Sequence, residues 1–157
     1  MIELSNQDLL ARLRSDEDHF TERKTFKDRN GWLRTAVAFA NSAPIGWPGI
    51  LFIGVTRDGR IETPAPDLDN LQRKDLGNEF ARAYPPFYYL PKIVMDETGQ
   101  QCLAVLVPGS AERPHFTGKS YVRVGSESME ASESQFVELI TQRQSKEQSA
   151  KHLGMEA

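Results

Sequence analysis

The sequence contains one cysteine and no long apolar run, and each absence excludes a class of protein. Because Cys102 is the only cysteine in 157 residues, the chain can form neither an intrachain disulfide nor a cysteine-rich zinc site. Cys102 lies within apolar residues, which is typical of a small buried side chain rather than a nucleophile. No apolar segment approaches the roughly 20 residues that span a bilayer, and the N-terminus lacks the pattern of a signal peptide. We therefore expect a cytoplasmic protein with no membrane partner.

The sequence also lacks a large excess of charge of either sign. Its 19 Lys and Arg residues nearly balance its 22 Asp and Glu residues, which gives a formal net charge of −3. This balance excludes a globally basic nucleic-acid-binding protein, but it allows a local basic face, which is what phosphate binding requires. No Gly-Lys-Ser or Gly-Lys-Thr comes directly after the turn at 46–49, so this turn is not a P-loop and gives no basis for nucleotide hydrolysis by that route.

The order of the predicted elements indicates an α+β fold. We predict a helix opened by the capping box Ser5–Asp8, a helix over 31–41, a helix after the prolines at 64–66, and a last helix beginning at Ser132 or Ser134. Strands are predicted near 19–24, 50–55, 88–95, 101–107 and 120–124. The run from Ile50 to Val55 has no alternating polar residue, which is typical of a strand covered on both faces.

These elements predict a single compact domain with a mixed, mostly antiparallel sheet flanked by about four helices. We expect the domain to span residues 1–143. Residues 144–157 are polar and lack an apolar face, so we expect a disordered tail there.

Several short phrases resemble the Schlafen-type AlbA-like domain family, and they occur in the family's order. The spacing from Glu17 to Glu22-Arg23-Lys24 is similar to the family's opening Glu, four residues and Glu-Phe-Lys. Ala38-Phe39-Ala40-Asn41 and Tyr121-Val122-Arg123-Val124-Gly125-Ser126 match two further phrases. The resemblance covers about residues 15–143. It implies a nucleic-acid-binding domain that contacts the backbone of RNA or DNA.

The same resemblance implies a second function, a metal-dependent endoribonuclease. Some relatives in the family use two Glu and one Asp as a catalytic and metal-binding centre, and the counterparts here are Glu17, Glu22 and Asp58. Thr56 occupies the usual place of the third acid, and Asp58 lies two positions later. Carboxylate oxygens are suitable ligands for Mg²⁺ or Mn²⁺, and no other cofactor is expected.

Geometry limits how the two glutamates can meet. Residues five apart on one strand point to opposite faces, so Glu17 and Glu22 converge only if Glu17 lies before the strand or a bulge intervenes. In the alternative interpretation, residues 16–18 form a solvated turn and Glu22 pairs with a nearby base.

Four cations are predicted to bind phosphate: Lys24, Arg113, Lys119 and Arg123. Lys24 shares a strand face with Glu22, so it could contact a phosphate or neutralise that carboxylate. The alternative for the whole set is ordinary scattered surface charge.

The aromatic residues near Pro85-Pro86 allow two interpretations. Tyr84, Phe87, Tyr88 and Tyr89 could stack on the bases of a single strand, or they could form core. A third function also remains open, a protein-interaction or oligomerisation module that uses exposed sheet edges and could form a homo-oligomer.

Overall fold

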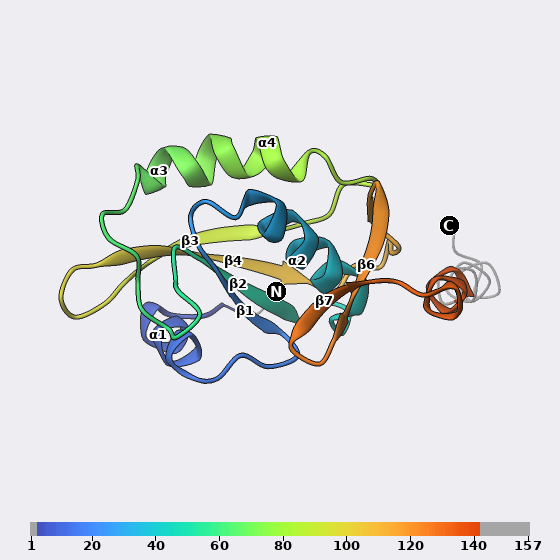
Figure 1. Cartoon of the computed structure of the whole chain (residues 1–157), viewed down its shortest axis with the longest axis horizontal. Helices are drawn as coiled ribbons and strands as arrows, with labels where there is room; N and C mark the ends of the chain where they lie inside the picture. Colours follow the sequence, from blue (N-terminus) through green and yellow to red (C-terminus); the bar gives the residue numbers. More distant parts are fainter. Residues whose placement is uncertain (1–2, 142–157) are drawn as a thin grey trace.

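The computed structural model describes residues 3–141, which form one α+β domain with two sheets (Figure 1). The larger sheet has the strand order β1-β2-β4-β3. β1 (Thr21–Lys24) runs parallel to β2 (Pro48–Ile53), while β4 (Gln101–Pro108) is antiparallel to both β2 and β3 (Leu90–Met95). This mixed, mostly antiparallel sheet confirms the predicted fold class. The predicted tail at 144–157 lies outside the described residues.

The central strand β2 is covered on both faces, as its apolar run predicts. Leu51 and Ile53 pack into the core that contains α2 (Arg29–Ser42). Ile50 and Phe52 point the other way, into the core formed with α1 (Asn6–Arg14). The two-residue side-chain period of a strand therefore explains why no polar residue interrupts β2.

Side-chain hydrogen bonds cap the N-termini of α1 and α2. Ser5 and Asp8 form the predicted capping box of α1, and the Asp28 carboxylate accepts from the Gly31 amide to cap α2. The helix predicted after 64–66 is a continuous helical stretch made of α3 (Leu68–Asn70), a π-helical turn η1 (Leu71–Asp75) and α4 (Leu76–Phe80). Figure 1 shows this stretch on the side of the sheet opposite α1. No helix within residues 3–141 is long and apolar enough to cross a membrane.

A smaller three-stranded sheet packs against α2. It consists of β5 (Phe116–Thr117), β6 (Lys119–Val124) and β7 (Glu127–Glu130), in that order. β6 and β7 form a tight hairpin whose turn requires the positive φ of 60° at Gly125. The predicted last helix occupies residues 133–141.

Asn41, the last residue of the Ala-Phe-Ala-Asn phrase, joins the two parts of the fold. Its buried amide nitrogen donates to the His115 and Tyr121 carbonyls at 3.0 and 2.8 Å, and its oxygen accepts from the His115 amide at 2.7 Å. These bonds satisfy polar groups that are buried between α2 and the second sheet. Asn41 therefore has a structural role between α2 and the second sheet.

Candidate nucleic-acid interface

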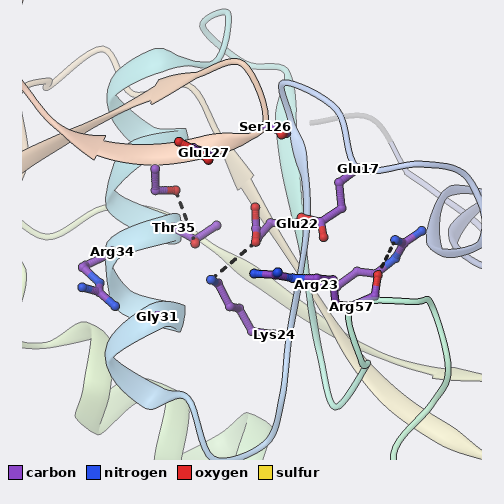
Figure 2. A pocket seen from close by; sticks show the side chains of 11 residues that line it. Glu17, Glu22, Arg23, Lys24, Gly31, Arg34, Thr35, Arg57, Ser126 and Glu127 are labelled. Carbon is purple, nitrogen blue, oxygen red and sulfur yellow. Dashed lines mark hydrogen bonds and ion pairs between the residues drawn. The ribbon is translucent and has the colours of Figure 1, made fainter.

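A polar pocket of about 540 Å³ opens between β1, α2 and the β6–β7 hairpin (Figure 2). Its lining is neither aromatic nor aliphatic, apart from the stems of charged side chains. It consists of three acids, four bases and four small residues: Glu17, Glu22 and Glu127; Arg23, Lys24, Arg34 and Arg57; Gly31, Thr35, Ser126 and Ser128. Such a lining suits a ligand that carries charge of both signs or a charged ligand with a counterion.

Glu17 and Glu22 meet in this pocket because Glu17 precedes the strand. Asp18 bridges to Thr21, and its carboxylate accepts from the Phe20 amide at 2.9 Å, so the chain turns before β1 begins. This turn meets the geometric condition stated above. Burial, the hydrogen bond with Glu22 and the Glu22 charge together raise the pKa of Glu17 to about 7. The Glu17 carboxyl group therefore titrates close to neutral pH.

Glu22 also has two cationic partners. Its Oε2 lies 2.7 Å from Arg123 Nη2, and its Oε1 lies 3.4 Å from Lys24 Nζ. Lys24 Nζ is also 3.8 Å from Asp28 Oδ2. The structure therefore brings Lys24 into the pocket beside the carboxylate. There it partly neutralises the Glu22 charge.

Asp58 lies outside the lining of this pocket. It occupies an exposed turn, where its carboxylate accepts from the Thr56 hydroxyl and lies 3.2 Å from Arg60 Nε. The Thr56 hydrogen bond is the main cause that lowers the pKa of Asp58. Among residues 3–141, no three His, Cys, Asp or Glu side chains are grouped so that they could hold a metal ion. The neighbour Arg57, in contrast, does line the pocket.

Arg123 is an internal residue of the site. Its side chain is 0% exposed, and its donors reach the His19, Asp18 and Thr21 carbonyls at 2.8, 3.2 and 3.2 Å, besides Glu22. The guanidinium also lies 5.1 Å from the centre of the Phe39 ring. Arg123 thereby holds the segment that carries both glutamates. In this conformation its donors are not available to a phosphate.

The other two predicted cations, Arg113 and Lys119, lie outside the pocket lining. Arg113 donates to the Ser110, Asn41 and Ala43 carbonyls, so it joins two loops. Lys119 is exposed and lies 3.2 Å from Glu130. Of the four predicted phosphate ligands, the structure thus places only Lys24 in the pocket.

Two pocket bases, Arg34 and Arg57, were not among the four phosphate ligands predicted from sequence. Arg34 is the one exposed residue between Gly31 and Asn41 of α2, and all the others there are buried. A single charged residue within so apolar a helix was the available signal. Nothing in the sequence distinguishes Glu127 from its acidic neighbours.

The fold and the site together define a small α+β domain with a polar pocket of mixed charge beside the β1 edge of its sheet. The chain belongs to the family described as "Schlafen, AlbA_2", whose model matches residues 17–132. The comparison with curated proteins found no match.

Two solved structures are similar to the chain. One is the N-terminal domain of a protein from Nitrosomonas europaea named as ATP-dependent DNA helicase RecG-related. It is 26% identical with a TM-score of 0.57, and the match covers 83% of this chain and 95% of that one. The other is the DIP2311 protein from Corynebacterium diphtheriae, at 19% identity and a TM-score of 0.54. That match covers 85% of this chain but only 27% of the other, and it indicates a shared fold.

Proposed function

We propose that this domain binds RNA or DNA through the phosphate backbone, with Lys24, Arg34 and Arg57 as the contacts. The observation that carries the proposal is the placement of these three bases around one pocket without aromatic side chains. Phosphate oxygens are suitable acceptors for such donors, whereas base reading would require stacking or edge contacts. The 26% identical helicase-related domain supports a nucleic-acid ligand for this family member.

Arg34 and Arg57 differ from the exposed arginines elsewhere on the molecule. Within residues 3–141, neither has a carboxylate partner. The exposed arginines of other surfaces do have one, in the pairs Arg14–Glu97, Arg60–Asp58, Arg73–Asp69 and Arg82–Glu79. An arginine without a carboxylate partner in its own protein can donate hydrogen bonds to an external anion and attract it by charge.

The test is fluorescence anisotropy with labelled RNA and DNA oligonucleotides over a range of salt concentrations. Replacing Arg34 and Arg57 together by Ala should weaken binding for all sequences and make the salt slope shallower by about one unit for each lost phosphate contact. The matched control replaces Arg60 and Arg73, which are also exposed but are paired with carboxylates. The proposal fails if the first variant binds as tightly as the wild type, or if the control loses as much.

The meeting of Glu17 and Glu22 favours a second candidate, metal-dependent cleavage of RNA. Mg²⁺ is often held by one or two carboxylates together with waters and substrate phosphates, so two glutamates beside a phosphate-binding surface fit such an ion. When bound, the ion would stabilise charge on the phosphate and activate water. Asp58, the third ligand expected from sequence, lies outside the pocket lining on the turn that carries Arg57, so Glu17 and Glu22 are the carboxylates that would hold the ion.

This second candidate has its own experiment. Mn²⁺ should raise the melting temperature of the wild type but not of Glu22→Gln, and it should support cleavage of a structured RNA by the wild type alone. If the wild type shows neither the thermal shift nor cleavage, the nuclease candidate is refuted while the binding proposal stands.

A further inference from the structure

The exposed apolar side chains gather at the end of the large sheet that lies away from the pocket lining. Nine large apolar side chains of the described residues are exposed, and four of them lie where β2 and β3 begin: Ile45, Trp47, Tyr88 and Leu90. Trp47 is 59% exposed and Tyr88 is 62% exposed. A monomer seldom leaves large aromatic side chains grouped in this way, so the cluster indicates an interaction surface.

The fold itself does not require these aromatic residues. Exposure alternates along the segment from Tyr84 to Leu90, so the side chains divide between two sides. The inward residues Phe87 and Tyr89 pack against Phe80 with ring centres 5.3 and 4.8 Å away, which confirms the core interpretation for those two. Tyr84 and Tyr88 point outward instead.

A preformed groove lies within this cluster. It has a volume of about 420 Å³ and is lined by seven residues, none charged, among them Ile45, Tyr88 and Pro108. Backbone hydrogen bonds hold its two walls together, from the Gly46 amide to the Gly109 carbonyl and from the Gly109 amide to the Trp47 carbonyl. Below it, Arg113 donates to carbonyls of both loops. The groove therefore needs little ordering before it binds a partner.

We propose that this surface, made of Ile45, Trp47, Tyr88, Leu90 and the groove between them, joins two copies of the chain in a symmetric dimer. A two-fold interface must be complementary to itself, and this face carries both a hollow and projecting aromatic side chains beside it. Each chain has a net charge of −3, so two copies repel each other where their charged residues meet. The groove has no charged residue in its lining, which makes this face favourable for contact between copies. Because no Lys or Arg lines the groove, it is a poor site for the phosphates of a nucleic acid.

The exposed aromatic side chains supply part of the area that a dimer needs. An aromatic side chain buries roughly 150–250 Å², so Trp47 and Tyr88, at 59% and 62% exposed, together offer about 250 Å². A stable interface needs about 800 Å² from each partner, and the aliphatic side chains and the polar rim can supply the remainder.

Pairing of strands between copies is blocked at the neighbouring edge of the sheet. The Asn6 side chain donates to the Met95 carbonyl at 2.9 Å and accepts from the Met95 amide at 3.0 Å. Pro91 has no amide hydrogen to offer. These two features protect the outer edge of β3 from pairing with the strand of another copy.

The two tryptophans of the chain provide an internal reporter for the test. Trp32 is fully buried and Trp47 is exposed, so only Trp47 should change its emission when copies associate. Sedimentation velocity and tryptophan emission are measured on the full chain over a wide range of protein concentration. We expect a concentration-dependent dimer, with a blue shift that disappears in Trp47→Phe.

Variants then locate the interface. Trp47→Ser and Tyr88→Ser should each weaken association about tenfold or more. Met129→Ser removes a side chain that is 46% exposed on the smaller sheet, and this control should associate like the wild type. A chain that stays monomeric, or one whose association survives both first variants or is lost equally in the control, overturns the proposal. Quenching of Trp47 in the monomer by a short oligonucleotide would also overturn it, in favour of base stacking.

Discussion

Replacing Arg123 by Met should strongly destabilise the protein, because the substitution leaves a buried carboxylate and several carbonyls without their donor. The Arg123 side chain is 0% exposed and that of Glu22 is 11% exposed. Removing one partner of a buried ion pair costs about 3–5 kcal/mol. Lys24 remains 3.4 Å from Glu22, which favours the lower half of that range. With an m-value of about 2 kcal/mol per molar, the urea midpoint should fall by about 2 M.

Lys119→Met is a matched control, since it removes another cation from the same strand. Lys119 and Glu130 are 64% and 57% exposed, so that pair should contribute less than about 1 kcal/mol. Adding Glu22→Gln to Arg123→Met should restore part of the loss, because no unpaired carboxylate remains. Urea unfolding followed by circular dichroism gives all four stabilities. A folded Arg123→Met protein within about 1 kcal/mol of the wild type would refute the structural role of Arg123.

Three further predictions concern single positions, Glu17, Gly109 and Gly77. The folded pKa of Glu17 is about 7 against an ordinary 4.5, so the stability that neutral Glu17 contributes is complete below about pH 4.5 and is lost as the pH rises through 7. Urea midpoints should therefore fall over this window in the wild type more than in Glu17→Gln, and parallel profiles would contradict the raised pKa. Gly109→Ala should cost about 1–3 kcal/mol, because its Cβ would lie 2.0 Å from the Ala43 carbonyl oxygen. Gly77→Ala, in a helix with its nearest contact at 3.7 Å, should instead stabilise by up to about 1 kcal/mol, and thermal unfolding distinguishes the two signs.

Local patterns in the sequence predicted the elements of the fold well. Three features depend only on residues that are close together in the sequence: the apolar run from Ile50 to Val55, the capping box at Ser5 and the helix around Phe39. Such short-range patterns depend on side-chain periodicity and capping, which act before any tertiary contact forms. The π-helical turn at Leu71–Asp75 was not predicted, since it depends on how the helix packs.

For the site as well, sequence reasoning found the residues that are close together along the chain and missed the contacts between distant ones. The sequence placed Glu17, Glu22 and Lys24 near one another because they belong to one short segment. It could not show that Arg123, 101 positions after Glu22, turns inward to hold that segment, or that Arg34 and Arg57 come from two other elements to face it. An arginine suits a phosphate and a buried carboxylate equally well, and only its surroundings decide between them.

The sequence by itself therefore determined the α+β class, the family and the two glutamates that open the domain. Each of these follows from the order of short motifs along the chain and from the spacing of residues within them. The tertiary structure alone decided which charges are available to a ligand. Arg123 and Arg113 donate their hydrogen bonds to carbonyl groups inside the protein. Arg34 and Arg57 instead line the pocket, where a ligand can reach their guanidinium groups. The free energy of a buried charge depends on distant partners that the fold brings within about 3 Å, and no local pattern encodes that distance.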